Sequence, residues 1–329
     1  MKKQNKIIHT VLDPKAIVGI IISAGGIYWA FKDFQFVEFT DSIQKVNYLY
    51  FVLTTLLLWG SVWFRGLRWR YLFRLDALPT TTSLYQAEMI GYFGNNIMPL
   101  RLGELLRAYL IGRELNISKI YVFGTVILER ILDMVSLVAL AFLLLLFYPL
   151  DVSLIKTISC VVCLVFMLIF ILLMIKHRLK TIKVKNKIMN AFNQMMEGLL
   201  SIRKGAILPI TAFSILIWGI YYLNVYLIQF AFGFNLSFSQ VLMILVFSSL
   251  VLAIPSAPGM IGTFHAAVKY TIVDLFGYAP HDGNSFAIFM HAYGYILFTV
   301  LGLYYFMKNQ FHANAIQNVI DMDLKKGNG

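Results

Sequence analysis

Residues 94–107 read Gly-Asn-Asn-Ile-Met-Pro-Leu-Arg-Leu-Gly-Glu-Leu-Leu-Arg, a polar break in an apolar stretch that runs from about 84 to 112. A second apolar stretch, 240–277, is broken in a similar way by Ile-Pro-Ser-Ala-Pro-Gly at 254–259. Proline removes a backbone donor and disfavours helix in the residue before it. Each half is also shorter than the roughly 20 apolar residues that a membrane crossing needs. The two stretches therefore predict re-entrant helical hairpins rather than simple spans.

The composition of the whole chain is typical of a membrane protein. Its 329 residues are 59% hydrophobic and 13% charged, whereas soluble domains have about 45–50% apolar and about 25% charged residues. This balance excludes a cytosolic enzyme and a nucleic-acid-binding domain. We predict an all-α polytopic membrane protein with two re-entrant hairpins and about six transmembrane helices, which are expected near 15–31, 47–64, 120–148, 155–175, 206–231 and 285–307.

The basic residues predict the orientation of the chain. The net charge is +12, and Lys and Arg gather before 15–31, after 47–64 (Arg65, Arg68, Arg70 and Arg74) and after 155–175. Cytoplasmic loops carry an excess of such residues. We therefore expect a multi-pass protein of the bacterial inner (cytoplasmic) membrane, with both termini in the cytoplasm. In this topology the first hairpin lies on the cytoplasmic side and the second on the outer side, so the two halves are inverted.

The two hairpins also agree locally in sequence, since Pro99-x-x-x-Gly103 matches Pro258-x-x-x-Gly262. Many transporters use an inverted repeat of spans and broken helices to place a site near the membrane midplane. We predict a single transmembrane domain over 1–329, made of a first half (about 1–175), a basic interfacial linker (176–205), a second half (about 206–308) and a cytoplasmic tail (309–329). The residues expected to shape the helix breaks are Asn96, Pro99, Gly103, Pro255, Pro258, Gly259 and Gly262.

Ionisable residues in the first hairpin predict an anion site. Arg101, Glu104 and Arg107 are spaced three residues apart, within reach of one face of a helix that begins at Pro99. A helix N-terminus carries partial positive charge, and arginine offers two donors that match phosphate oxygens. In the alternative interpretation, Glu104 simply pairs with Arg107 while Arg101 reaches the headgroups and anchors the hairpin.

The third expected span, 120–148, carries Glu129, Arg130 and Asp133. Glu129 and Asp133 lie one turn apart on one helix face and need cationic partners. Arg101 or Arg107 could supply them and so join the hairpin to the span. Such a network either holds the structure together or acts as a gate that opens when lipid enters, and the sequence leaves both open.

The second hairpin carries His265 and Lys269, which lie one turn apart on the helix after Pro258. They could form a second anion site on the outer side; alternatively, His265 is an ordinary core residue and the Lys269 side chain extends to the interface. Cys160 and Cys163 have no His or carboxylate beside them, so neither a zinc site nor a disulfide framework is expected. No cofactor is implied.

Four motifs in order carry a family resemblance: Arg-Gly-Leu-Arg-Trp-Arg at 65–70, Asn-Ile-Met-Pro-Leu-Arg-Leu-Gly-Glu-Leu-Leu-Arg at 96–107, Glu-Arg-Ile-Leu-Asp at 129–133 and Pro-Gly-Met-Ile-Gly-Thr-Phe-His-Ala-Ala at 258–267. Through them the chain resembles the transmembrane-domain family of lysylphosphatidylglycerol synthases, which are flippase-like. The resemblance implies lipid translocation. Its best-known members move aminoacylated phosphatidylglycerol and carry a fused soluble synthase, which we expect to be absent here.

One motif departs from the family pattern. The second hairpin of the family usually reads P-G-G-x-G-x-x-E, whereas this chain has Met260 at the second glycine and His265 at the glutamate. The carboxylate expected to meet a cationic headgroup is therefore missing, and histidine titrates near neutrality. A plain anionic phospholipid or a polyprenyl-phosphate-linked lipid becomes the expected substrate.

The expected function is flipping of such a lipid between leaflets, without enzymatic activity, nucleic acid or metal. Arg101 and Arg107 are expected to hold the phosphate, with Glu104, Glu129, Arg130 and Asp133 balancing or gating them, and His265 and Lys269 receiving the headgroup. The main alternative is a non-transporting scaffold for a separate lipid-modifying or glycosyl-transferring enzyme, and a third is an intramembrane transferase that uses His265 or Asp133. The sequence leaves the oligomeric state open. The energy source is open, with Glu104, Asp133 and His265 as titratable candidates.

Overall fold

The computed structural model of the chain describes residues 46–75, 78–98, 101–147, 187–251 and 257–327, and the isolated residues Tyr28, Val37, Thr40, Asp41 and Gln44. Every regular element in these ranges is helical. In chain order they are α4 (Tyr48–Arg70), α5 (Thr81–Ile97), α6 (Gly103–Glu114), α7 (Lys119–Phe147), α9 (Lys187–Leu199), α10 (Ile207–Ala231), α11 (Phe238–Val251), the 3-10 turn η2 (Pro258–Met260), α12 (Thr263–Lys269), the π-helical η3 (Tyr270–Leu275) and α13 (Pro280–Gly327).

Three of these helices are long and apolar enough to cross a membrane: α4, α10 and the Pro280–Asn309 part of α13. They coincide with three of the expected spans. The expected span at 120–148 is the 29-residue helix α7, which carries charged residues in its middle. The expected spans at 15–31, apart from Tyr28, and at 155–175 lie outside the described residues, as do Pro99 and Pro255. An all-helical membrane protein is thus confirmed over the described ranges.

The first hairpin breaks later than the sequence suggested. We expected the break to begin at Gly94, but α5 continues to Ile97, and Met98 still donates its backbone N–H to the carbonyl of Gly94. Glycine and asparagine have low helix propensity, which tertiary contacts override. Here Asn96 is held by α13, because its amide donates to the Thr299 hydroxyl at 2.9 Å. The next helix, α6, then starts at Gly103.

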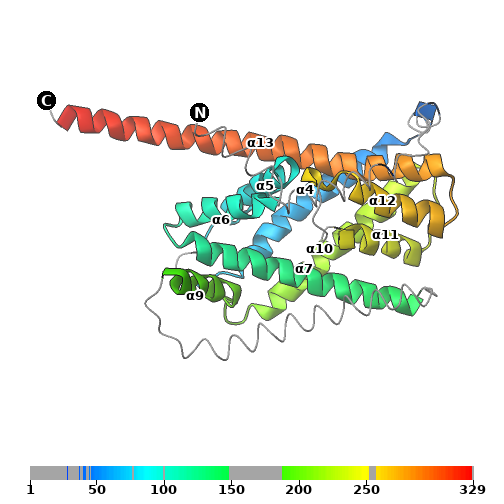
Figure 1. The fold of residues 1–329 in the computed structure, drawn as a ribbon, viewed down its shortest axis with the longest axis horizontal. Coiled ribbons are helices and arrows are strands. Elements are labelled where there is room, and N and C mark those ends of the chain that lie inside the picture. The colour runs from blue at the N-terminus through cyan, green and yellow to red at the C-terminus, as the bar shows by residue number, and fades with distance from the viewer. Residues whose placement is uncertain are drawn as a thin grey trace.

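The helices are arranged around a central pair formed by α4 and α10, which run side by side (Figure 1). In this view α5 and α6 lie on the left, α11 and α12 lie on the right, α13 runs along the upper edge, and α7 runs across the lower part with α9 beneath its start. Helix α5 packs on α13 and α6 on α7, while α11 packs on α7 and α12 on α13. The two hairpins therefore sit on opposite sides of the central pair.

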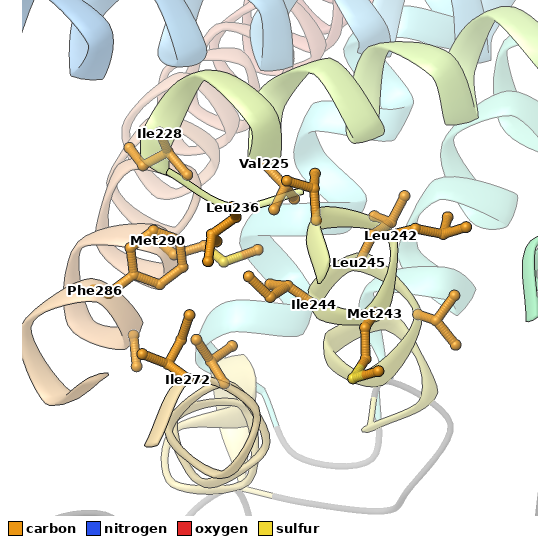
Figure 2. Close-up of a cluster of buried hydrophobic side chains, with 14 of the residues drawn as sticks. Val225, Ile228, Leu236, Leu242, Met243, Ile244, Leu245, Ile272, Phe286 and Met290 are labelled. Carbon is orange, nitrogen blue, oxygen red and sulfur yellow. The ribbon is translucent and has the colours of Figure 1, made fainter. Parts of the chain in front are cut away.

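The main apolar core lies in the second half of the chain. Helix α11 is buried over most of its length, and its side chains pack against α10, η3 and the start of α13. Figure 2 shows Ile244, Ile272, Phe286 and Met290 converging from three of these elements. A helix that is apolar all round is stable only when it is covered on several sides, and this packing provides that cover.

Helix α9, in the segment expected to be an interfacial linker, lies against the start of α7. The two helices touch at glycines, because a Cβ atom on Gly198 would overlap the carbonyl oxygen of Tyr121, and one on Gly124 would overlap that of Met195. Close approach of two helix backbones requires residues of this size. The linker helix is therefore docked on the first half of the chain.

Candidate functional site

A cluster of charged side chains lies where α4, α5, α6 and α7 meet. We call it the ion-pair cluster, and it consists of Arg65, Arg68, Glu88, Glu104, Arg107, Glu129, Arg130 and Asp133. Each helix contributes one or more of these groups from positions inside the helix rather than from a loop. Burying an ionised group is costly unless opposite charges and hydrogen bonds compensate it. The cluster meets that condition by joining four guanidinium groups to four carboxylates.

Glu129 is the centre of the cluster, and its side chain is fully buried. It accepts a close hydrogen bond from Arg65, and its other oxygen accepts from Arg107 Nη1 at 2.9 Å. Arg130 Nη2 at 3.2 Å and Arg68 Nη2 at 3.6 Å complete its surroundings. Four positive charges around one carboxylate hold it in the ionised form.

Asp133 lies one turn further along α7 and ties that helix to α4. Arg68 Nη2 donates to one of its oxygens at 2.6 Å, and Arg65 Nη2 donates to the other at 3.0 Å. Arg68 also reaches α10, because its Nη1 donates to the Ser214 hydroxyl at 3.2 Å. The cluster therefore extends from the first hairpin to the central helix pair.

Arg107 joins both helices of the first hairpin to α7. It binds Glu88 of α5 in a close contact, Glu104 of its own helix at 2.7 Å and Glu129 of α7. Its guanidinium carbon also lies 4.8 Å from the ring centroid of Trp69, a cation–π contact. The expected pairing of Glu104 with Arg107 is thus present, and Arg107, at 1% exposure, is occupied by carboxylates in this conformation.

The cluster has a buried end and an open edge. The side chains of Arg65, Arg68, Glu88, Arg107 and Glu129 are exposed by 3% or less, whereas those of Arg130, Glu104 and Asp133 are exposed by 33%, 17% and 15%. At that edge Arg130 lies 3.5 Å from both Glu104 and Asp133. A charged ligand would reach the cluster from this side.

Arg101 lies at the tip of the first hairpin and faces the second. Its Nη2 approaches the sulfur of Met260 at 3.7 Å, and its side chain is exposed. None of the described ion pairs involves Arg101. Both residues have left-handed backbones, with φ of 55° at Arg101 and 58° at Met260. Residues other than glycine rarely adopt this backbone conformation. The tips of the two hairpins therefore share an unusual turn.

The second hairpin is held at its tip by α13. His291 Nε2 donates to the carbonyl of Gly259 at 2.8 Å, and a Cβ atom on Gly259 would meet the ring of Tyr295. His265 lies beside His291 with 4.8 Å between ring centroids, and the Gly262 N–H donates to His265 Nδ1 at 3.4 Å. His265 and Lys269 are both buried on α12. In this conformation neither is open to a headgroup.

A neutral polar contact in the second half joins α10 to α4 and α13. Asn224 donates through Nδ2 to the Thr54 carbonyl at 2.7 Å and accepts a close hydrogen bond from the Tyr293 hydroxyl. All three groups are buried. This contact joins α10 to α13 through uncharged groups, whereas ion pairs join α4 to α7.

Three members of the ion-pair cluster do not stand out as site residues in the sequence: Arg65, Arg68 and Glu88. The sequence predicts that Arg65 and Arg68 follow a span that ends at residue 64, whereas α4 continues to Arg70 and buries both side chains. Their spacing of three residues, which places both on one helix face, was the available signal. Glu88 was not considered, although a glutamate inside the apolar stretch 84–112 was itself a signal. Asp133 is bound by Arg65, Arg68 and Arg130 rather than by Arg101 or Arg107.

Among the described residues, no group of three or more His, Cys, Asp or Glu side chains is arranged to hold a metal ion. The acidic residues of the ion-pair cluster are matched by arginines instead. The donor set of the site thus consists of guanidinium groups, which suit phosphate and carboxylate ligands.

The fold and the site define an α-helical membrane protein whose broken helices enclose paired charges. The chain belongs to the family described as the lysylphosphatidylglycerol synthase TM region, which matches residues 16–302. It is similar to the UPF0104 membrane protein MJ1078 of Methanocaldococcus jannaschii, with 29% identity over 55% of this chain and 79% of that protein.

Two further archaeal relatives match over more of the chain. A UPF0104 membrane protein of Methanothermobacter thermautotrophicus is 25% identical over 74% of this chain and 79% of its own length. The UPF0104 membrane protein PH1989 of Pyrococcus horikoshii is 26% identical over 75% of this chain and 82% of its own length. No solved structure matches this chain.

Proposed function

We propose that this protein moves an anionic phospholipid or a polyprenyl-phosphate-linked lipid between the leaflets of the cytoplasmic membrane, and that it is not an enzyme. The observation that carries the proposal is the meeting of the two helix breaks at Arg101 and Met260, with Arg101 close enough to Arg130 and Glu104 of the open edge to interact with them electrostatically. Broken helices in lipid are tolerated where they line a site or a cavity. An exposed guanidinium at that point suits a lipid phosphate.

The proposal includes a single domain of two inverted halves, with six spans and two re-entrant hairpins. Helix packing supports it, because α5 packs on α13 and α6 on α7, while α11 packs on α7 and α12 on α13. In the proposed repeat, α4, α5, α6 and α7 correspond to α10, α11, α12 and α13. Replacing each helix by its counterpart gives the same set of contacts, and the contact between α4 and α10 maps onto itself. Both termini are proposed to be cytoplasmic.

Individual residues support the same repeat. If Pro99 corresponds to Pro258, then Arg101 corresponds to Met260, and these two share a left-handed backbone and touch each other. Contact between equivalent residues is what a two-fold axis passing between them produces. Asn224 precedes Pro258 by as many residues as Arg65 precedes Pro99, and each joins the central pair to an edge helix.

The roles proposed for the other residues follow from their exposure. Arg101 and Arg130 make the first contact with the phosphate, since Arg101 is exposed and the half-buried Arg130 is the most accessible member of the ion-pair cluster. Arg107 reaches the phosphate only if its carboxylate partners move. Glu104, Glu129 and Asp133 hold the arginines in place until then. His265 and Lys269 meet the headgroup on the outer side after the second hairpin opens.

The test is lipid exchange in proteoliposomes. Fluorescent phosphatidylglycerol and phosphatidylcholine are placed in both leaflets, and dithionite then quenches the label that reaches the outer leaflet. We expect wild-type protein to expose the inner-leaflet phosphatidylglycerol, and Arg101→Ala to slow this about tenfold or more, which is the value of one charged hydrogen bond. Arg113→Ala is the matched control, because Arg113 is an exposed arginine at the far end of α6, the helix that follows Arg101.

Two outcomes would contradict the proposal. Equal rates for wild type and Arg101→Ala would remove Arg101 from the phosphate site. Exchange no faster than in protein-free vesicles, for these lipids and for a polyprenyl-phosphate probe, would reject translocation and favour the scaffold, which is then tested by recovering a partner enzyme with the purified protein.

A further inference from the structure

We propose that Glu88 binds a proton when a lipid phosphate enters the site, so that each phosphate charge crosses the membrane together with one proton. This inference rests on the proposed function and adds to it a co-substrate and the residue that carries it. It starts from the charge of the ion-pair cluster. Within the described residues, ion pairs join four guanidinium groups to four carboxylates, so the cluster is neutral when all eight are ionised.

Arg101 lies outside the described ion pairs and can meet the phosphate first, but the neutral cluster behind it has no spare positive charge for a phosphate that moves further in. At the open edge the phosphate would meet Arg130, which lies 3.2 Å from the buried Glu129 and 3.5 Å from both Glu104 and Asp133 at the edge itself. These carboxylates repel the incoming phosphate strongly, because the dielectric constant of the surroundings is low. If one carboxylate of the cluster takes up a proton, the cluster gains one net positive charge. That charge balances one phosphodiester.

The ion pairs indicate which carboxylate is the proton acceptor. Glu129 contacts four arginines, Asp133 contacts three, and Glu104 contacts Arg107 and Arg130. Glu88 has one close partner, Arg107, and its second oxygen lies 3.9 Å from Arg65 Nε, which is beyond hydrogen-bonding distance. It is also 2% exposed. Glu104 also has two arginines within 4 Å, but it is 17% exposed, whereas Glu88 is buried and has only one of its two arginines close. A buried carboxylate with weak compensation is the one for which the neutral form costs least.

The groups that face Glu88 come from three neighbouring helices. Helix α4 brings Arg65, α6 brings Arg107, and α7 brings Glu129 and Arg130 at longer range. No described ion pair places a charged side chain of α13 or η2 within 4 Å of Glu88. Because Arg107 also binds Glu104 and Glu129, a phosphate that draws Arg107 toward the open edge removes the close partner of Glu88. A proton from the solvent then binds Glu88 in place of Arg107, and this proton leaves when the phosphate leaves.

Coupled movement of one phosphate charge and one proton carries no net charge. The test therefore imposes either a pH gradient or a potassium diffusion potential on proteoliposomes, and measures the steady-state distribution of fluorescent phosphatidylglycerol between leaflets. In wild type we expect a gradient of one pH unit to shift this distribution by up to about tenfold toward the alkaline side, and the diffusion potential to have no effect. A pH-sensitive dye inside the vesicles should report protons entering with the lipid.

In Glu88→Gln we expect the pH response to disappear, while Glu197→Gln, a change of an exposed glutamate on α9, keeps it. If Glu88→Gln fails to fold, the response of wild-type protein to the two gradients still tests proton coupling. A wild-type lipid distribution that follows the diffusion potential and ignores the pH gradient would overturn proton coupling and leave lipid translocation intact. A pH response that persists in folded Glu88→Gln would assign the proton to another group. Failure to exchange any lipid would instead defeat the proposed function itself.

Discussion

Glu129 and Glu88 occupy the same cluster but differ in how many arginines surround them. Removing the charge of Glu129 leaves four guanidinium groups facing an uncharged amide in a buried site. Breaking a buried ion pair by removing one partner costs about 3–5 kcal/mol. We therefore expect Glu129→Gln to lower the stability of the purified protein by about that amount, and Glu88→Gln to lower it by clearly less. Thermal unfolding in detergent, followed by intrinsic fluorescence, measures the difference.

The exposed Glu197 again provides the control, because its neutralisation removes no ion pair among the described residues and should leave the unfolding temperature unchanged. Equal destabilisation by Glu129→Gln and Glu88→Gln would mean that the number of arginine partners does not rank the carboxylates. That result would also weaken the assignment of the proton to Glu88.

At the scale of elements, the first hairpin depends on close contact between α5 and α6. A Cβ atom on Gly103 would overlap the carbonyl oxygen of Gly91, which is backbone and cannot move aside. Overpacking of this kind typically costs about 1–3 kcal/mol. We expect Gly103→Ala to lower the unfolding temperature and to slow lipid exchange, since the start of α6 carries Glu104 and Arg107 into the cluster.

Gly219 supplies the matched change, because a Cβ atom there meets no other atom within 4 Å and the residue lies inside α10. Gly219→Ala should be neutral or stabilising by up to about 1 kcal/mol, as expected for alanine in a helix. If Gly103→Ala were as stable as wild type, the two helices of the hairpin would not be in the close contact described above.

At the scale of the whole molecule, the contact between the hairpin tips is one of several places where the two proposed halves touch. In the proposed mechanism of alternating access, the two hairpin tips separate when the halves move against each other. We expect a short, reducible thiol crosslink between Arg101→Cys and Met260→Cys, in protein whose native Cys160 and Cys163 are replaced by serine, to stop lipid exchange. Reduction should restore exchange to the rate of the same protein before crosslinking. Exchange is measured by the dithionite assay before and after each step.

Each single-cysteine variant, treated with the same reagent, shows the effect of modification without a crosslink. Because Arg101→Cys is itself expected to slow exchange, each rate is compared with that of the same variant before treatment. Exchange that continues unchanged in crosslinked protein would rule out relative movement of the tips as part of transport.

The sequence determined the membrane character, the all-helical class and the approximate ends of the described spans, because these depend on local hydrophobicity and helix propensity. For the spans that became α4, α7, α10 and α13, most of the predicted ends lie within a few residues of the observed helix ends. The sequence also identified Glu129 and Asp133 as carboxylates in need of cationic partners, and Arg107 as one residue that could supply them. Where helices ended beside polar residues, as at Ile97 and Arg70, the prediction failed because tertiary contacts override weak local preferences.

Only the tertiary structure decided which charges pair. Arg65 and Arg68 look like loop residues in the sequence, and Glu88 is a single acid in an apolar stretch, yet α4, α5 and α7 bring all three to Glu129 or Arg107. The meeting of Arg101 with Met260 joins residues far apart in the chain. Such pairings depend on how helices cross, and helix crossing is set by packing of side chains from different segments, which no local pattern contains.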